Sequence, residues 1–334
     1  MRQWICGVIN RTAGLPSSFL DGFFGTGSIA VEMSRRGVAR ITAVDNLESN
    51  CVMLRAFFAR GEDFPDSALM PEIMDRLNNL EPRDGYITRC FAGAYFTRDN
   101  CRRMDAIREE IAALSAAGEI SPAAHDYLLA SFLLGADRVA NTLGQYDAFL
   151  KNIDADPVST GGRHLVDERV RTRFRLNALG RLERGSVTVM NADLLLVLPA
   201  IDAEVAYFDP PYNGRQYCDN YHVLENLARW NKPPVYGKTA KFDRAGLKSP
   251  FSFRKTAGKA LKSLLSARAR HVFISYSSEG ILDRGSIEEI LAEGGAVEVH
   301  ELPYPVFGNG AGVSRRRSVT EYLFHVRRKG GPRG

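Results

Sequence analysis

The stretch EVAYFDPPYNGRQYCDNY, residues 204–221, joins the pattern of a buried strand to an abrupt stop. Its apolar run, Val205–Phe208, is typical of a strand inside a sheet. The following Asp209-Pro210-Pro211-Tyr212 ends that strand, because proline fixes φ and lacks a backbone donor. We therefore expect Asp209 at the carboxyl end of a strand, which is the edge where open α/β sheets bind their ligands.

This corner suits chemistry on a planar amine. A carboxylate oxygen and a main-chain carbonyl can each accept one hydrogen of an exocyclic base amine, while a tyrosine ring stacks on the base. The lone pair of the nitrogen is then localised for attack on an electrophile. The alternative is a proline turn in which Asp209 caps the next helix and Tyr212 packs, and the four-residue motif alone leaves both interpretations open.

Residues 17–45 predict a site for a nucleoside-type cofactor. They contain, in order, a strand at 17–21, a glycine turn at 22–28, a helix at about 29–36 and a strand at 41–44 that ends in Asp45. Gly25 and Gly27 allow the backbone to approach a ligand, and an acid after the second strand is placed to bind a ribose diol. The glycine spacing, GxxGxG, differs from the dinucleotide fingerprint GxGxxG, which disfavours a nicotinamide cofactor. The alternative is a tight turn without a ligand.

The rhythm of short strands and helices is interrupted between about residues 61 and 184. Apolar residues from Met104 to Leu114 recur at helical spacing before Gly118, and Ser121-Pro122 is typical of the start of another helix. We expect an inserted helical hairpin followed by arginines that either contact phosphates or form an ordinary solvated face. These arginines are Arg163, Arg169, Arg171, Arg173, Arg175, Arg181 and Arg184.

The chain around these motifs resembles the DNA adenine-N6 methyltransferases, in particular the Dam-like class, whose cofactor motif precedes a target-recognition insertion and then the catalytic motif. The resemblance covers most of the chain. It rests on Asp209–Asn213, Arg215–Tyr217, Asn220–His222 and Leu224-Glu225. It implies an α/β fold with a Rossmann-like, S-adenosylmethionine-dependent sheet, antiparallel C-terminal strands and a mainly helical insertion. We therefore expect a catalytic domain of residues 1–60 and 185–334 and a target-recognition region of residues 61–184.

The resemblance also implies roles for individual residues. Catalysis falls to Asp209, Pro210, Pro211 and Tyr212. S-adenosyl-L-methionine would contact Asp21, Phe23, Gly25, Thr26, Gly27, Asp45, Asn46, Asp193 and Asp209. For Asp193, capping of an apolar helix at 194–198 is an equal alternative. The substrate would contact Tyr212, Asn213, Arg215, Tyr217, Tyr221, Lys238, Lys241 and Lys248.

The three lysines in that set belong to a basic run. Between Arg229 and Arg270 there are twelve lysines and arginines, opposed within the run by Asp243 alone, and aromatic residues are interleaved among them. Such a run favours a phosphate backbone as its partner, and the alternative is a basic loop without function.

The amino terminus departs from the family pattern. Members of this class usually begin with a Gly-Lys-type segment that contacts the cofactor, whereas Met1–Trp4 stands where that segment would end and carries no such lysine. We expect this departure to affect cofactor affinity.

The remaining expectations concern the reaction partners. We expect methylation of adenine N6 in duplex DNA with the target base rotated out of the stack, in a restriction-modification or phage-type role beside a cognate restriction enzyme. The alternatives are a catalytically impaired DNA-binding homologue, or methylation of cytosine N4 or of an RNA or protein amine. With a net charge of +5 and no apolar run long enough to span a membrane, we expect a cytoplasmic protein without a membrane partner. Cysteine and histidine spacings predict no metal site.

Overall fold

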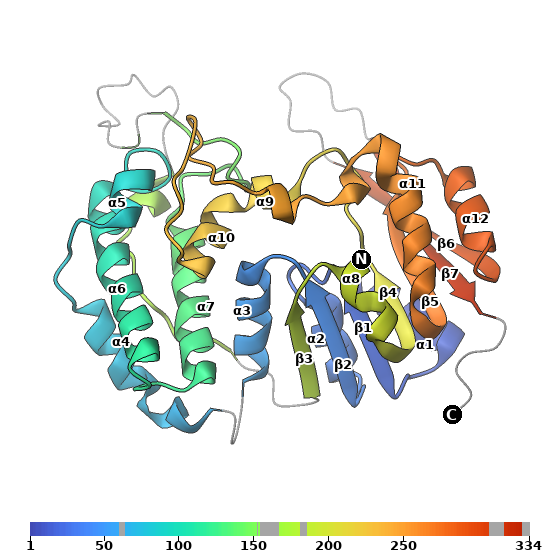
Figure 1. Ribbon diagram of the computed structural model, residues 1–334, viewed down its shortest axis with the longest axis horizontal. Coiled ribbons are helices and arrows are strands. Elements are labelled where there is room, and N and C mark those ends of the chain that lie inside the picture. Colours follow the sequence, from blue (N-terminus) through green and yellow to red (C-terminus); the bar gives the residue numbers. More distant parts are fainter. Residues whose placement is uncertain (60–63, 152, 154–166, 181–185, 307–316, 329–334) are drawn as a thin grey trace. The chain divides into compact units, whose positions relative to one another are not determined.

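The computed structural model describes residues 1–59, 64–151, 153, 167–180, 186–306 and 317–328. The chain divides into two compact units (Figure 1). The sheet unit consists of residues 1–46, 184–216 and 248–334, and the helical unit consists of residues 47–183 and 217–247. Within the described ranges, no helix has both the length and the apolar character that a membrane crossing requires.

The sheet unit is built on seven strands in the order β3-β2-β1-β4-β5-β7-β6. Neighbours from β3 to β5 pair in parallel, whereas β7 runs antiparallel to both β5 and β6. The predicted α/β fold with antiparallel C-terminal strands is therefore confirmed. The strands are β1 Ser18–Gly22, β2 Arg40–Asp45, β3 Ser186–Asn191, β4 Asp202–Phe208, β5 Arg268–Ser277, β6 Ala296–Val306 and β7 Arg317–Arg327.

Both faces of the central strands are covered, as expected for parallel strands with continuous apolar runs. On one face, α8 (Leu194–Val197), α11 (Arg254–Ser263) and α12 (Arg284–Ala292) share an apolar core with alternate strand residues such as Leu20 and Phe208. The intervening residues, such as Phe19, are equally buried but lie outside that core. The opposite face is therefore covered by the two N-terminal helices, α1 (Arg2–Ala13) and α2 (Ser28–Arg35) (Figure 1).

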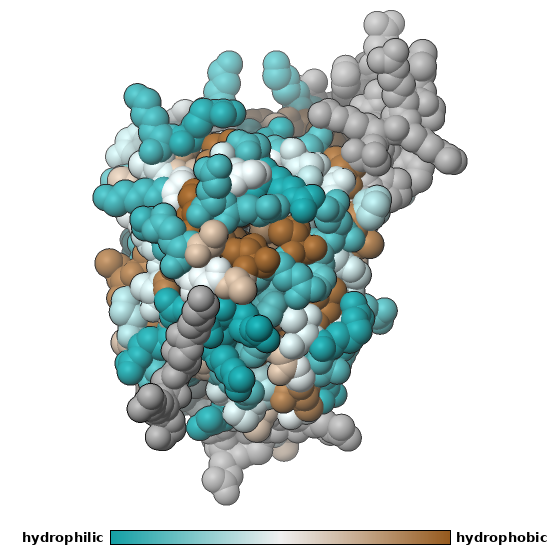
Figure 2. Space-filling view, turned by 90° about the vertical axis from the view of Figure 1, so that its right-hand side faces the viewer, coloured by the Kyte–Doolittle hydropathy of each residue, from teal (hydrophilic) through white to brown (hydrophobic). Residues whose placement is uncertain are grey.

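The outer strand β6 carries charged residues where its edge is unpaired. Glu298 and Glu301 are exposed on this strand, and Arg284 of α12 forms an ion pair with Glu301 at 2.5 Å. Figure 2, which faces this side of the sheet unit, shows mainly hydrophilic residues with small apolar areas between them. Charge on an edge strand opposes pairing with another chain.

The helical unit contains the predicted hairpin. The two helices are α6 (Arg98–Ala116) and α7 (Pro122–Arg138), and the Ser121 side chain caps α7 by accepting a hydrogen bond from the Ala124 N–H at 3.2 Å. The other α-helices described in this unit are α3 Glu48–Phe58, α4 Met70–Asn78, α5 Tyr86–Phe91, α9 Tyr217–Asn220 and α10 His222–Arg229. One apolar cluster joins α3, α4, α5, α6, α7 and α10.

The unit boundaries differ from the predicted domain boundaries. The sequence reasoning ended the first catalytic segment at residue 60 and assigned everything after 184 to the catalytic domain. Helix α3 and residues 217–247 instead belong to the helical unit. The division of function between catalysis and target recognition stays a prediction.

Glu225 explains why α3 and α10 belong to the same unit. Its buried carboxylate accepts hydrogen bonds from the backbone N–H groups of Glu48 (3.0 Å) and Ser49 (2.9 Å) and from Ser49 Oγ (2.9 Å). It also forms an ion pair with Arg229, one helical turn later. A carboxylate is favourable at this place because the first N–H groups of α3 have no partners within the helix.

Replacing Glu225 by alanine would leave buried donors and Arg229 without their acceptor. We expect Glu225→Ala to lower the free energy of unfolding of the helical unit by about 3 kcal/mol, as for other broken buried ion pairs. Urea denaturation followed by circular dichroism measures this loss. Glu72→Ala, at an exposed position in the first turn of α4, is the matched control and should cost less than about 1 kcal/mol. Equal losses of stability in the two variants would show that the hydrogen bonds of Glu225 to α3 do not stabilise the helical unit.

Candidate active site

The site lies where the carboxyl ends of β1 and β4 meet. The two strands pair in parallel with Gly22 opposite Phe208, and the Asp209 N–H continues the ladder by donating to the Gly22 carbonyl at 3.3 Å. From β1 the chain crosses to β2 on one side, and from β4 it crosses to β5 on the other. Such a reversal of strand order is where open α/β sheets leave a crevice for ligands. The predicted place of Asp209, after the catalytic strand, is confirmed.

The glycine turn after β1 has the backbone that its sequence predicts. Gly25 and Gly27 take positive φ values of 53° and 69°, and even Phe23 does so at 63°. Two hydrogen bonds hold this conformation: Phe23 N–H donates to the Val44 carbonyl and Gly25 N–H donates to Asp45 Oδ2, both at 2.9 Å. Asp45, predicted as a ribose ligand, thus also fixes the loop to the end of β2.

Asp21 has a buried carboxyl oxygen without a hydrogen-bond partner among the described residues. Its carboxyl is buried, Oδ2 accepts from the Ala30 N–H at 2.9 Å, and Oδ1 has no hydrogen-bond partner among the residues described. Burial raises its pKa well above the usual range, and the nearby Asp209 and Asp45 carboxylates raise it further. A buried acceptor beside two other acids is costly unless a donor, above all a cationic one, reaches it.

These residues fit S-adenosylmethionine. The cofactor carries two positive charges, an ammonium and a sulfonium. Three acids at the carboxyl ends of β1, β2 and β4, namely Asp21, Asp45 and Asp209, suit these charges. The unpartnered Asp21 Oδ1 is an acceptor for the ammonium, Asp45 suits a ribose hydroxyl, and the glycines from 25 to 27 leave space beside the chain.

The Asp209 carboxylate has an unusual proton affinity. The side chain keeps exposed surface, yet the protein packed around it and, to a smaller extent, the carboxylate of Glu321 raise its pKa to about 6. Glu321 lies on β7 opposite Ser277 of β5, and its own pKa is also raised, chiefly by burial. Asp209 is thus ionised at neutral pH but close to its titration range.

Tyr212 is held beside this carboxylate. Its ring packs at an angle against Tyr276, with 5.9 Å between ring centres, and its carbonyl accepts from the Ile281 N–H at 2.8 Å. Burial raises the pKa of Tyr212, and the Glu321 carboxylate adds to that shift. The phenol is therefore neutral, and the half-buried ring remains available for stacking.

The segment after the corner is tied to the start of the 248–253 loop. Gln216 and Ser249 exchange two hydrogen bonds, Ser249 N–H to Gln216 Oε1 at 2.7 Å and Gln216 Nε2 to the Ser249 carbonyl at 3.1 Å. Two residues later, Phe251 packs edge-on against Phe23 of the glycine turn at 5.1 Å between ring centres. One loop therefore contacts both the segment after the Asp209 corner and the glycine turn.

The other predicted residues of the sheet unit divide into two groups. Asp193 caps α8, since Oδ1 accepts from the Leu195 N–H at 3.0 Å. The capping alternative is therefore confirmed, and contact with the cofactor stays a prediction. Asn213 Oδ1 accepts from the Arg215 N–H at 3.0 Å, which shapes the turn after Tyr212. Pro210, Pro211, Thr26, Asn46 and Lys248 are also in this unit, and their roles stay predictions.

Four predicted substrate contacts, Tyr217, Tyr221, Lys238 and Lys241, belong to the helical unit. The rings of Tyr217 and Tyr221 stack at 6.2 Å between centres, and Tyr217 is exposed. Lys238 is exposed, whereas Lys241 forms an ion pair with Asp147 at 2.6 Å. Their contact with the substrate stays a prediction.

The basic run is less unbalanced in space than in sequence. Within the described part of the chain, six of its twelve cations form ion pairs with carboxylates, and all six carboxylates lie outside the run. These pairs are Arg229 with Glu225, Lys232 with Glu109, Lys241 with Asp147, Arg244 with Asp219, Lys262 with Glu293, and Arg268 with Asp202. Counting charges within the run missed these partners because all of the carboxylates lie outside it, five of them on elements or loops other than that of their cation.

Sequence reasoning also missed Glu321. It lies more than a hundred residues after Asp209 in an ordinary strand pattern, and only the pairing of β5 with β7 brings it to the site.

Comparison with known proteins identifies the family to which this site belongs. The family model of the D12 class N6 adenine-specific DNA methyltransferases matches residues 2–290. The modification methylase StsI of Streptococcus sanguinis is 29% identical over 337 residues, which are 96% of this chain and 49% of the relative. The Type II methyltransferase M.FokI of Planomicrobium okeanokoites is 27% identical over 93% of this chain and 48% of its own. M.NlaIII of Neisseria lactamica, also a Type II methyltransferase, is 28% identical over 98% of this chain and 97% of its own.

The chain thus spans about half the length of StsI and M.FokI and nearly the whole of M.NlaIII. The match to the family model includes the glycine turn, the three acids and the Asp209 corner. With this site and this match, the chain belongs to the D12 class N6 adenine-specific DNA methyltransferase family.

Proposed function

We propose that this protein transfers a methyl group from S-adenosylmethionine to the N6 amine of adenine in duplex DNA. The observation that carries the proposal is the hydrogen bond between Asp209 and Gly22. This bond holds the Asp209 carboxylate, the proposed acceptor of the amine hydrogens, directly beside the glycine turn and the acids Asp21 and Asp45 that would bind the cationic cofactor. Membership of the adenine-specific family supports adenine N6 over cytosine N4 and over RNA or protein amines.

Each residue of the corner has a distinct task in this proposal. The Asp209 carboxylate and the Pro210 carbonyl accept the two amine hydrogens, and Tyr212 stacks on the base. S-adenosylmethionine supplies the methyl group when bound. The methylated nitrogen must lose a proton, for which Asp209, ionised above a pKa of about 6, is the acceptor. Positioning and stabilisation of positive charge on the nitrogen account for most of the acceleration.

The DNA partner follows from access to the reacting amine. An adenine amine inside a duplex is paired, so the base has to rotate out of the stack to reach Tyr212 and Asp209. The helical unit and the lysines Lys238 and Lys248 are the proposed contacts to the rest of the duplex. The names of StsI and M.FokI, a modification methylase and a Type II methyltransferase, support a modification role beside a cognate restriction enzyme.

Asp209→Asn keeps the shape of the side chain but replaces an acceptor by a group that also donates. We expect methyl transfer to DNA to fall by about 100-fold or more, since one well-placed electrostatic contact contributes that much in other enzymes. Transfer of a radiolabelled methyl group under single-turnover conditions measures the rate, and calorimetry with S-adenosylmethionine shows that the cofactor still binds. A variant with unchanged turnover would remove Asp209 from the mechanism.

The raised pKa of Asp209 predicts an acidic limb in the rate. Because only the carboxylate accepts the amine hydrogens, kcat/KM for DNA should fall as the pH drops through about 6. Glu321→Gln removes a negative charge that raises the pKa of Asp209, so the acidic limb should move to lower pH. The shift should be partial, because burial is the larger cause of the raised pKa. Glu289→Gln, exposed on α12, is the control and should leave the profile in place. If the acidic limb of Glu321→Gln stays at the wild-type pH, the Glu321 carboxylate does not raise the pKa of Asp209.

Asp21→Asn tests the cofactor site without measuring catalysis. The variant keeps an acceptor for the Ala30 N–H but loses the charge that meets the ammonium, so affinity for S-adenosylmethionine should fall by about 10-fold or more. Because the pKa of Asp21 is raised, cofactor binding should release a proton in the wild type and less in the variant. Calorimetry in two buffers of different ionisation enthalpy measures both effects. Asp202→Asn, exposed at the amino end of β4, should change neither; equal behaviour of the two variants would overturn the assignment.

A further inference from the structure

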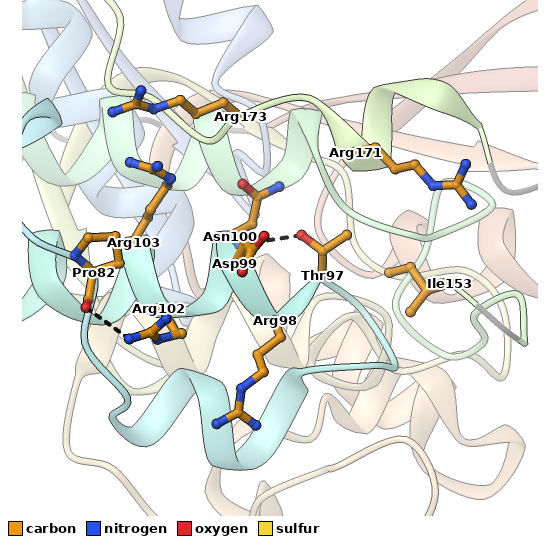
Figure 3. A pocket seen from close by; sticks show the side chains of 10 residues that line it. All are labelled: Pro82, Thr97, Arg98, Asp99, Asn100, Arg102, Arg103, Ile153, Arg171 and Arg173. Atoms are coloured by element: carbon orange, nitrogen blue, oxygen red, sulfur yellow. Dashed lines mark hydrogen bonds between the residues drawn. The ribbon is translucent and has the colours of Figure 1, made fainter. Parts of the chain in front are cut away.

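A cavity in the helical unit remains outside the site described above. It has a volume of about 740 Å³, and five arginines are among the residues that line it (Figure 3). Arg98, Arg102 and Arg103 come from the first two turns of α6, and Arg171 and Arg173 come from a segment some 70 residues later. Among the described residues that line it, Asp99 is the one acidic residue.

Asn100 holds the two arginine-bearing segments together. This buried side chain donates from Nδ2 to the carbonyls of Val170 (3.3 Å) and Thr172 (2.9 Å), and its Oδ1 accepts from the Phe174 N–H at 2.9 Å. The segment, which begins with the 3-10 helix Glu168–Arg171, is therefore fixed along the start of α6, with Val170 and Phe174 buried and Arg171 and Arg173 exposed. The three hydrogen bonds of the buried Asn100 amide therefore fix the position of the arginines on both sides of the cavity.

The charges in the cavity are incompletely balanced by the protein. Asp84 pairs with Arg98 at 3.0 Å and with Arg102 at 3.3 Å. Arg103 has no ion pair within the described part of the chain. Burial lowers its pKa and the guanidinium of Arg173 lowers it further, while the carboxylates of Asp99 and Glu81 offset only part of this shift. Two like charges held beside each other favour an anion between them, because the anion removes their repulsion.

The arrangement of the arginines indicates the kind of anion. Guanidinium groups present paired donors that match phosphate oxygens. In Figure 3, Arg103 and Arg173 extend toward the same side of the cavity, whereas Arg98 and Arg171 extend in other directions. They do not converge on one point, as they would around a single bound phosphate. Spread cations along an open cavity suit several phosphates in succession, which a nucleic acid backbone presents.

We propose that this arginine cavity binds consecutive backbone phosphates of the DNA substrate, outside the target base, and so supplies sequence-independent affinity. The assignment rests on the proposed function, since that function makes duplex DNA the substrate. Asp84 limits the affinity of the cavity by occupying two of its arginines.

The experiment compares the salt dependence of duplex binding between variants. Arg103→Gln with Arg173→Gln removes the two adjacent cations, and we expect weaker binding and a slope of log K against log salt that is smaller by about 1.8, from about 0.9 per phosphate contact. Asp84→Asn releases Arg98 and Arg102, so binding should become tighter and the slope steeper. Fluorescence anisotropy with an unmethylated duplex between 50 and 200 mM KCl, roughly the range in which such slopes are resolved, gives both quantities.

The control removes equal charge elsewhere on the same unit. Arg76→Gln with Arg89→Gln changes exposed arginines of α4 and α5 that do not line the cavity, and its slope should stay near that of the wild type. Thermal unfolding confirms that each variant is folded.

The outcomes separate this inference from the proposed function. A slope in the Arg103/Arg173 double variant equal to the wild-type slope overturns the cavity assignment, whether or not the protein methylates DNA. If that variant loses only the binding of inorganic phosphate or pyrophosphate in calorimetry, the cavity takes small anions and the assignment is likewise wrong. Loss of slope in a protein that makes no N6-methyladenine would uphold the cavity and overturn the proposed function.

Discussion

The hydrogen bond from the Asp209 N–H to the Gly22 carbonyl extends the parallel pairing of β1 and β4 by one residue, and the chemistry of the site depends on it. The two residues are 187 positions apart in sequence. Parallel pairing aligns the ends of both strands at one edge of the sheet, so a glycine turn and a proline corner become neighbours without any direct sequence relation. The large insertion between them does not disturb this register, because it leaves the sheet after β2 and returns at β3.

Negative charge is the second organising feature of that edge. Asp21 and Asp45 lie at the carboxyl ends of β1 and β2, Asp209 directly follows the neighbouring β4, and Glu321 adds a fourth carboxylate from β7. Burial and the neighbouring carboxylates raise the pKa of Asp21, Asp209 and Glu321, and the resulting uptake of protons limits the repulsion among these acids. A cationic cofactor relieves the same repulsion when it binds. In the proposed function, the acids thus favour binding of the cofactor, and the raised pKa of Asp209 suits it to accept a proton near neutral pH.

Local patterns predicted the sheet, the glycine turn, the α6–α7 hairpin and the position of Asp209, because each depends on residues close together in sequence. Features that depend on distant residues were missed. Glu321 is brought to Asp209 only by strand pairing, and Asn100 joins Arg171 and Arg173 to α6 through hydrogen bonds across some 70 residues. The ion pairs of the basic run were missed for a related reason, since their carboxylates lie outside the run. The boundary of the helical unit differs from that of the predicted recognition region at α3, because Glu225 of α10 binds the first N–H groups of α3.

The central claim is that the Asp209 corner methylates adenine N6 in DNA, and the identity of the product tests it most directly. Unmethylated duplex DNA would be incubated with the protein and S-adenosylmethionine, digested to nucleosides and analysed by mass spectrometry, with Asp209→Asn in parallel. The account predicts N6-methyldeoxyadenosine from the wild type and almost none from the variant. N4-methyldeoxycytidine, or unmodified DNA from a protein that binds both the cofactor and the duplex, would contradict it.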